Sequence, residues 1–411
     1  MKGRFLMLRV NGQRLWDNLN EMGRIGAGER GRTRLAFTDE DLEARRLLVR
    51  WMEELGLEVH TDPYANIWGL RAGREELPPI VVGSHIDTVR EAGMFDGVLG
   101  VLSGLEAVRA LNEAGVSTRR PVAVISFSDE EGGRFSAGTM TGSRLMAGCI
   151  QLEELAEKRD QRGVSWLEAL ERSGFTGSSS ILRPHAYLEY HIEQGPVLCD
   201  KGARIGVVEG VVNLSWMRFT FYGQANHAGA FPMERRRDAG LAASSATVAL
   251  NRLAFELGAG TVITSGQALQ EPNLPNIVPG RAVLTVDLRS FKEEVFASGL
   301  ARAEAVVEEE AARHGVEVSV ELLTRLEGAV FAREMTELVE RTAGALDLSS
   351  WRMPSGAGHD AQIMSRLCPT AMIFCPSEEG RSHCPEEFTS QEDAVAGADV
   401  LLNCLLELAE D

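Results

Sequence analysis

The sequence predicts an α/β protein built on a mixed, largely parallel sheet, with a smaller α+β domain inserted into it. Apolar strand-like runs alternate with helix-like runs through the first half of the chain and again near its end. Between them the order changes to strand, helix, two strands, helix and strand. A chain of 411 residues also exceeds the usual size of a single hydrophobic core. We therefore expect one domain from residues 1–211 and 328–411, and a second from residues 212–327.

The first part of the chain has the elements of a parallel sheet. Four apolar residues at helical spacing predict a helix over residues 41–55, and residues 57–60 and 66–70 have the pattern of short strands. The run PPIVVGSH predicts a buried strand, the apolar face of residues 98–111 a helix, and PVAVISFSD a second buried strand. This order is a βαβ crossover, whose two strands run parallel.

The inserted segment has the pattern of a ferredoxin-like unit. Its predicted elements are, in order, SWMRFTFYG, the Ala-rich residues 238–257, GTVITSGQAL, RAVLTVDLRS, residues 293–314 and VEVSVELL. Strands and helices in this βαββαβ order form a compact two-layer unit of about a hundred residues. We expect it to be a small lid on the larger domain.

Composition argues against two classes of partner. The formal net charge of −18 repels polyphosphates and anionic lipids, so we expect neither a nucleic-acid nor a membrane partner. We find no signal-peptide pattern and no apolar run of membrane-spanning length. The six cysteines include no CxxC pair, which is typical of reduced, buried thiols. These features predict a cytoplasmic protein.

Histidine and acidic residues follow the two predicted parallel strands. His85 and Asp87 come at the end of the first strand, and Asp129, Glu130 and Glu131 come after the second. The carboxyl ends of parallel strands meet at one edge of a sheet, where open α/β sheets bind ligands. We therefore expect these side chains to lie together.

Three further candidate metal ligands lie in other motifs: Asp96 in MFDGVLGV, His191 in EYHIEQGPVL and His383 in GRSHCPEE. Imidazole and carboxylate suit zinc and its first-row neighbours, and a pair of such ions needs one shared carboxylate. If Asp96 bridges two ions, His85 and His191 complete three protein ligands on one of them. Glu131 and His383 complete three on the other, and each ion keeps an open position.

Glu130 has no ligand role in this arrangement. An unligated carboxylate beside a bridging water is what a general base needs. Asp87 is expected to accept a hydrogen bond from the outer nitrogen of His85 and so to fix its tautomer. Each motif also has a structural explanation, because single histidines are usually packed or exposed and paired glutamates usually lie on a solvated surface. The run EEGGRF, however, follows an apolar strand and continues into glycines. Its glutamates are therefore not expected on the solvated face of a helix.

A series of motifs carries a family resemblance, in the order GSHIDTV, MFDGVLGV, FSDEEGGRF, AGTMTGSR, EYHIEQGPVL, NHAGAFPMERRRD, LPNIVPG, DLRS, GAGHDA and MIFCPSEEGRSHCPEEF. Together they resemble the amidase family of hydantoinase and carbamoylase type, within the wider M20 group of two-metal peptidases. The similarity runs from about residue 10 to the C-terminus. HIEQGPVL separates the chain from the aminopeptidases of that group.

The resemblance implies a role for each matching residue. It implies that the two metals are bound by His85, Asp96, Glu131, His191 and His383, with Asp96 as the bridge and Glu130 as the catalytic base. It also implies that the substrate is held by Gln194, His227, Asn276 and Arg289, the last three from the lid. His227 would polarise the ureido oxygen as charge develops on it, and Arg289 would hold a carboxylate by two parallel bonds.

Alternation along VLTVDLRS places Arg289 on the polar face of its strand, with Thr285 and Asp287. Without the resemblance, a surface salt bridge for Arg289 and a capping role for His227 are equally good interpretations. The chain also departs from the family. Leu214 stands where many members carry a polar residue, and Trp216 stands where the allantoate enzymes carry arginine, which favours a carbamoyl amino acid over allantoate.

We therefore expect a two-metal amidohydrolase that cleaves N-carbamoyl-L-amino acids to the amino acid, ammonia and carbon dioxide. The alternatives are allantoate or β-ureidopropionate as substrate, or an M20 aminopeptidase or N-acyl amino acid deacylase. A non-enzymatic binding protein on the same fold should have lost a ligand or the base, and none is missing. Zinc is the first choice of metal, with manganese, cobalt and nickel as alternatives. The substrate is expected to be a small ureido or amide compound with a carboxylate, enclosed by domain closure, and the resemblance implies a homodimer through the lid.

Overall fold

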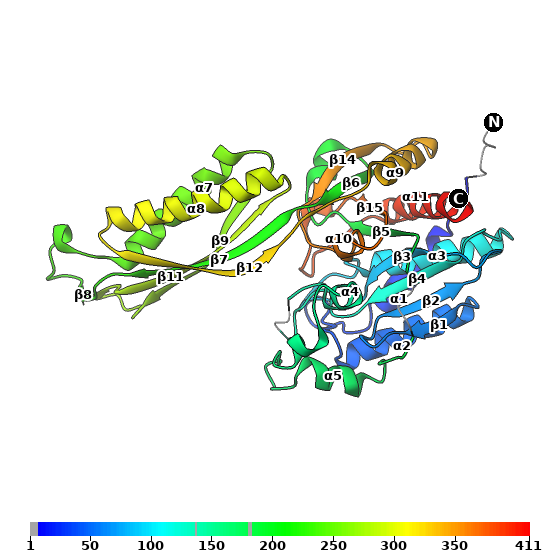
Figure 1. Cartoon of the computed structure of the whole chain (residues 1–411), viewed down its shortest axis with the longest axis horizontal. Helices are drawn as coiled ribbons and strands as arrows, with labels where there is room; N and C mark the ends of the chain where they lie inside the picture. The colour runs from blue at the N-terminus through cyan, green and yellow to red at the C-terminus, as the bar shows by residue number, and fades with distance from the viewer. Residues whose placement is uncertain (1–6, 136–137, 180–182) are drawn as a thin grey trace. The chain divides into compact units, whose positions relative to one another are not determined.

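The computed structural model describes residues 7–135, 138–179 and 183–411. The chain divides into two compact units (Figure 1). The first unit comprises residues 1–210 and 330–411, and the second comprises residues 211–329. Each unit has its own sheet and its own core.

The larger sheet is parallel at its centre and antiparallel at its edges. Its strands are β1 (Glu58–Thr61), β2 (Ile67–Arg71), β3 (Ile80–His85), β4 (Val122–Phe127), β5 (Ala186–Ile192), β6 (Ile205–Val211), β13 (Ala329–Val330), β14 (Ser350–Ser355) and β15 (Thr370–Cys375). They lie in the order β1-β2-β4-β3-β5-β15-β6-β13, and β14 pairs with β6. β4, β3, β5 and β15 run parallel, as the predicted βαβ crossover required. The strands β1, β2 and β6 join this centre through antiparallel pairs.

Long helices of this unit share one hydrophobic core with the sheet. These helices are α1 (Gly12–Met22), α2 (Asp39–Glu54), α3 (Val98–Glu113), α9 (Arg333–Ala345) and α11 (Gln391–Glu410). α3 is buried along almost its whole length because it lies between the sheet and α1 and α11. It begins directly after Asp96, so the parallel strands and this helix together fix the position of that residue.

Short helices and loops of the same unit form a smaller core. They include α4 (Thr141–Met146), η1 (Leu152–Leu155) and α5 (Trp166–Ser173). The unit also has the short helices α6 (Val197–Lys201), α10 (Asp360–Met364) and η3 (Glu378–Gly380). The fully buried Trp166 packs edge-on against Phe37, and Phe135 joins the same cluster. The indole N–H of Trp166 donates to the carboxylate of Asp129 at 2.7 Å, which ties this core to the loop after β4.

The second unit has the predicted βαββαβ order. Its main elements are β7 (Asn213–Tyr222), α7 (Ala239–Leu257), β9 (Val262–Glu271), β11 (Arg281–Ser290), α8 (Glu293–Arg313) and β12 (Glu317–Leu326). The four strands form an antiparallel sheet in the order β12-β7-β11-β9, and residues of α7 and α8 share one core with its apolar face. A short ribbon of β8 (Asn226–His227) and β10 (Ile277–Val278) lies outside this sheet, and η2 (Met233–Arg235) follows β8.

Two further sequence expectations concern exposure. All six cysteines are free, but Cys149 and Cys199 are exposed, so the prediction that the thiols are buried was wrong for these two. Cys384 is half-buried, and the other three cysteines are buried as predicted. Within the ranges that the structure describes, no helix is long and apolar enough to cross a membrane.

Candidate metal centre

The four parallel strands carry candidate ligands at or beyond their carboxyl ends. His85 is the last residue of β3, and residues 129–131 follow β4. His191 is the next-to-last residue of β5, and the loop after β15 carries His383. Because these strand ends meet at one edge of the sheet, histidines and carboxylates from distant parts of the chain lie together there.

Asp96 lies at the centre of this cluster. Its Oδ1 atom is 3.1 Å from His191 Nε2 and 3.5 Å from His85 Nε2, and its Oδ2 atom is 3.2 Å from His383 Nε2. Glu131 Oε2 is 3.4 Å from the same nitrogen of His383. These residues form two groups that share Asp96, and within each group the ligand atoms lie within 4.8 Å of one another.

The tautomers of two histidines fit a cation. His85 Nδ1 lies 3.0 Å from the main-chain oxygen of Asp87, and His191 Nδ1 lies 2.9 Å from that of Ile192. A carbonyl oxygen only accepts, so each Nδ1 carries a hydrogen and each Nε2 is the nitrogen that faces Asp96. Contacts of 3.1–3.5 Å between these nitrogens and the carboxylate call for a positive charge, which a proton on each ring or a bound cation would supply. With a cation bound, each ring would be neutral and Nε2 would be the ligand atom.

The acidic residues fit the same interpretation. Glu130 and Glu131 have side chains only 8% and 6% exposed. Burial raises the pKa of the Glu131 carboxyl to about 8 and raises the pKa of Glu130 well above its usual range. Glu131 Oε1 is buried without a hydrogen-bond partner. Divalent cations would supply the positive charge that keeps such carboxylates ionised, so the donor set fits a two-metal site.

Glu130 belongs to neither ligand group. Its Oε2 atom is 3.7 Å from His85 Nε2, beside the group formed by His85, Asp96 and His191. The main-chain N–H groups of Glu130 and Glu131 donate to the two carboxylate oxygens of Asp87 at 3.2 Å.

Asp87 accepts the predicted hydrogen bond from His85, and it does so with its main-chain oxygen. The bond from His85 Nδ1 goes to the main-chain oxygen of Asp87, while the nearest carboxylate oxygen is 3.7 Å away. The carboxylate is turned toward the loop after β4, where it holds the N–H groups of Glu130 and Glu131. Asp87 thus orients the ring of His85 with its backbone and the acidic loop with its side chain.

Gly97 lets the chain pass close to His85. Its φ is +67°, and a Cβ atom there would lie 2.4 Å from atoms of the His85 ring. We expect Gly97→Ala to lower the free energy of unfolding of the metal-free protein by about 1–3 kcal/mol from backbone strain alone, with the clash adding to this. Urea denaturation measures the effect.

Gly344→Ala is the matched control for that experiment. Gly344 lies in α9, and no atom is near enough to touch an added Cβ. The control should be neutral or raise stability by up to about 1 kcal/mol, since alanine is a better helix former. Equal stability of Gly97→Ala and the wild type would show that the close approach to His85 is wrong.

A third cluster, Glu189, His191 and His359, shares His191 with the first group. The Glu189 carboxylate already accepts hydrogen bonds from the hydroxyl of Ser84 at 2.8 Å and the main-chain N–H of Ala361 at 2.7 Å. Both ring nitrogens of His191 are also engaged, one facing Asp96 and one donating to the main chain. We therefore interpret this cluster as support for His191, whose ring packs edge-on against His359 at 4.6 Å. His359 belongs to the sequence motif GAGHDA, to which the sequence alone assigned no role.

Gln194, a predicted substrate residue, lies beside Asp96. Its amide nitrogen donates to Asp96 Oδ2 at 2.7 Å and lies 3.3 Å from the hydroxyl of Ser382. Its backbone has a φ of +58°, which is uncommon for a residue with a side chain. Its amide oxygen is buried without a hydrogen-bond partner.

His227 lies on the short ribbon of the second unit, and Asn276 comes directly before its strand β10. His227 pairs with Ile277, and the N–H of Ala228 donates to the main-chain oxygen of Asn276 at 2.9 Å. His227 Nδ1 accepts the N–H groups of Gly229 and Ala230 at 3.0 and 3.1 Å. The exposed ring therefore caps a turn, as the capping interpretation requires, and its hydrogen is placed on Nε2, where it can donate outward.

Arg289 lies on the polar face of the second sheet, opposite the buried residues of β11, as predicted. Its Nε and Nη2 atoms contact the Asp287 carboxylate at 2.9 and 2.8 Å. Trp216, which lies opposite Asp287 on β7, donates its indole N–H to the same carboxylate at 2.8 Å. Asp287 therefore fixes one edge of the guanidinium.

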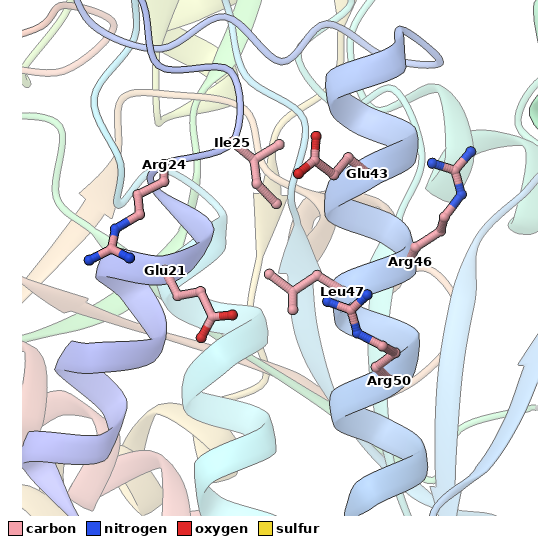
Figure 2. A pocket seen from close by; sticks show the side chains of 7 residues that line it. All are labelled: Glu21, Arg24, Ile25, Glu43, Arg46, Leu47 and Arg50. Carbon is pink, nitrogen blue, oxygen red and sulfur yellow. The ribbon is translucent and has the colours of Figure 1, made fainter.

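A groove elsewhere on the first unit is unrelated to these residues. It has a volume of about 450 Å³ and is lined by Glu21, Arg24, Ile25, Glu43, Arg46, Leu47 and Arg50. In Figure 2 the side chains of Arg24 and Arg46 point away from each other. The charged side chains of the groove are exposed and do not converge on one point, so we assign it no function.

The fold and the cluster define a class of protein, a metal-dependent hydrolase with histidine and carboxylate ligands at the edge of an α/β sheet. Comparison with known proteins gives the family. Residues 81–407 match the peptidase family M20/M25/M40. The N-carbamoyl-L-amino-acid amidohydrolase of Rhizobium meliloti is 41% identical, over 98% of this chain and 97% of the relative. The ureidoglycolate hydrolase of Arabidopsis thaliana is 35% identical, over 92% of this chain and 82% of the relative.

A solved structure agrees. A hydantoinase/carbamoylase family amidase from Burkholderia multivorans superposes with a TM-score of 0.94 at 38% identity, covering 98% of this chain and 99% of that one. The chain belongs to the peptidase M20/M25/M40 family and, within it, to the amidases of hydantoinase/carbamoylase type. It is a hydrolase of a metal-dependent family that acts on C–N bonds other than peptide bonds, and the predicted resemblance is confirmed.

Proposed function

We propose that this chain hydrolyses the ureido C–N bond of N-carbamoyl-L-amino acids and releases the amino acid, ammonia and carbon dioxide. The observation that carries the proposal is the paired ligand cluster around Asp96, with Glu130 beside it and outside both groups. The named activity of the relative from Rhizobium meliloti supports the choice of substrate.

We further propose the metal ligands that the resemblance implied. His85, Asp96 and His191 would hold one divalent ion, and Asp96, Glu131 and His383 a second. Zinc is the first choice because the ligands are imidazole and carboxylate, and manganese, cobalt or nickel suit the same set. Such ions would polarise the substrate oxygen and acidify a water molecule.

The protein residues then supply proton transfer and orientation. Glu130 takes a proton from the attacking water and later donates it to the departing nitrogen. His227 donates from Nε2 to the ureido oxygen, where negative charge grows in the transition state. Gln194 and Asn276 offer amide groups to the substrate. Arg289 binds its carboxylate through the guanidinium group.

Arg289→Lys is expected to raise KM for an N-carbamoyl amino acid by about 10- to 100-fold, with a smaller change in kcat. Lysine keeps the charge but loses the planar fork, and charge-assisted hydrogen bonds contribute about 1.5–3 kcal/mol each. Steady-state kinetics measure the change. Arg218→Lys is the control, because Arg218 lies on β7 and pairs with the exposed Glu321. An unchanged KM in Arg289→Lys would remove Arg289 from the substrate site.

A second candidate function keeps the chemistry and changes the substrate. The ureidoglycolate hydrolase relative favours a ureido acid of that kind, and allantoate and β-ureidopropionate are two further candidate substrates. Trp216 supports a carbamoyl amino acid, because it stands where the allantoate enzymes carry arginine. Its indole N–H donates to Asp287, the partner of Arg289. The function of an M20 aminopeptidase or N-acyl amino acid deacylase has weaker support.

We propose that the first unit is the catalytic domain and the second the lid and dimerisation domain. A homodimer through the lid, the absence of nucleic-acid and membrane partners, and a cytoplasmic location stay predictions from the sequence. The experiment that tests the function is an ammonia-release assay with each metal in turn. Its substrates are N-carbamoyl-L-amino acids, their D forms, allantoate, ureidoglycolate and β-ureidopropionate. For an N-acetyl amino acid, whose hydrolysis gives acetate and no ammonia, release of the free amino acid is measured instead. Highest kcat/KM on an N-carbamoyl-L-amino acid supports the proposal, and preference for another substrate contradicts it.

A further inference from the structure

Glu387 is a buried carboxylate that the proposed mechanism does not use. It is 5% exposed and lies in the loop that joins β15 to α11, four residues after His383. We propose that Glu387 is a positioning residue that holds Asp96 and His383 in place for metal binding. The inference rests on the proposed two-metal site and adds a residue to it.

One oxygen of Glu387 holds the backbone of Asp96. Glu387 Oε1 accepts the main-chain N–H groups of Phe95 and Asp96 at 3.0 and 3.2 Å. These two N–H groups stand just before α3, where the loop has no regular backbone partner for them. The carboxylate therefore fixes the peptide that carries the shared ligand, from a position almost 300 residues away in the sequence.

The other oxygen holds the loop of His383. Ser382 donates its hydroxyl hydrogen to Glu387 Oε2 at 2.9 Å, and the same hydroxyl lies 3.0 Å from Asp96 Oδ2. A hydroxyl has one hydrogen, so it can serve only one of these carboxylates at a time. If a cation took up Asp96 Oδ2, the hydrogen of Ser382 would serve Glu387 and would keep the adjacent His383 anchored.

Packing leaves Glu387 little freedom to move. A Cβ atom on Gly93 would lie 2.3 Å from Glu387 atoms, so the carboxylate rests directly on the backbone that leads to Asp96. Its acceptors thus serve two chain segments, one that carries the shared ligand Asp96 and one that carries His383. Residues of this kind behind a ligand typically change metal affinity about 10- to 100-fold when they are replaced.

The test is the variant Glu387→Gln. Glutamine has the same shape, but its NH₂ group cannot accept, so it must lose either the N–H groups of Phe95 and Asp96 or the hydroxyl of Ser382. Glu386→Gln is the matched control, since the neighbouring Glu386 is exposed. Competition against a chromophoric chelator gives the zinc affinity of each protein. The visible absorption of the cobalt-loaded protein reports the geometry of the ligands.

We expect Glu387→Gln to bind zinc about 10- to 100-fold more weakly and to show a changed cobalt spectrum, with unaltered far-ultraviolet circular dichroism. Glu386→Gln should match the wild type in all three. Wild-type affinity and an unchanged spectrum in Glu387→Gln would overturn the inference while the two-metal site stands. If the wild type itself binds neither zinc nor cobalt, the proposed function falls, and this inference with it.

Ser382→Ala gives a second test that removes only a hydroxyl. It breaks the link from Glu387 to the loop of His383 and leaves the bonds to Phe95 and Asp96 intact. We expect about 10-fold weaker zinc binding. Should Glu387→Gln fail to fold, this variant decides alone, and wild-type affinity in it would overturn the proposal.

Discussion

Replacing Glu130 by glutamine is expected to lower kcat by about 10²- to 10⁴-fold and to leave two metal ions bound. Glutamine has the shape of the carboxylate but can neither take a proton from water nor deliver one to the leaving nitrogen. The metal content should persist because Glu130 lies outside both ligand groups. Ammonia release and elemental analysis of the same preparation measure the two results.

Glu54→Gln is the control for this variant, because Glu54 is an exposed glutamate at the end of α2, far along the chain from the cluster. It should retain wild-type kcat. Activity that survives in Glu130→Gln would remove Glu130 as the base. Loss of metal together with activity would instead place Glu130 among the ligands.

Asp96→Asn is expected to abolish tight binding of both ions and to reduce activity below about 10⁻³ of wild type. The amide replaces a carboxylate whose two oxygens face His191 and His383 in different groups. Loss of the metal ions removes the several kcal/mol of transition-state stabilisation that they would supply. Elemental analysis after dialysis, combined with the ammonia assay, measures both effects.

Chelation of the wild-type protein provides the comparison for Asp96→Asn. Removing the metals from the wild type should abolish activity, and adding zinc, manganese, cobalt or nickel should restore it. The same additions should not restore Asp96→Asn. A variant that keeps both ions would show that Asp96 does not bridge them.

The centre of the first sheet could be predicted from the sequence because its pattern is unambiguous. Continuous apolar runs flank a helix with an apolar face, and β3, α3 and β4 follow that pattern closely. Once those strands are parallel, His85 and residues 129–131 must meet at one edge. The polar face of β11, with Arg289, followed equally from alternation along a strand.

Other features depend on contacts that local sequence does not contain. β8 and β10 have two residues each, which is too short for any periodicity, yet they bring Asn276 beside His227. The pair Glu386 and Glu387 looks like a solvated surface, and only the fold shows that the second is buried against the backbone of Asp96. The sequence predicted that Asp87 accepts a hydrogen bond from His85, but only the structure shows that the turn after β3 presents the main-chain oxygen for it.

The most direct test of the central claim is an anomalous difference map from crystals of the zinc-loaded protein, measured at the zinc absorption edge. We predict two peaks about 3.5–4 Å apart, one on each side of the Asp96 carboxylate, with His85 and His191 at one and Glu131 and His383 at the other. A single peak, or two peaks that do not share Asp96, would contradict the account.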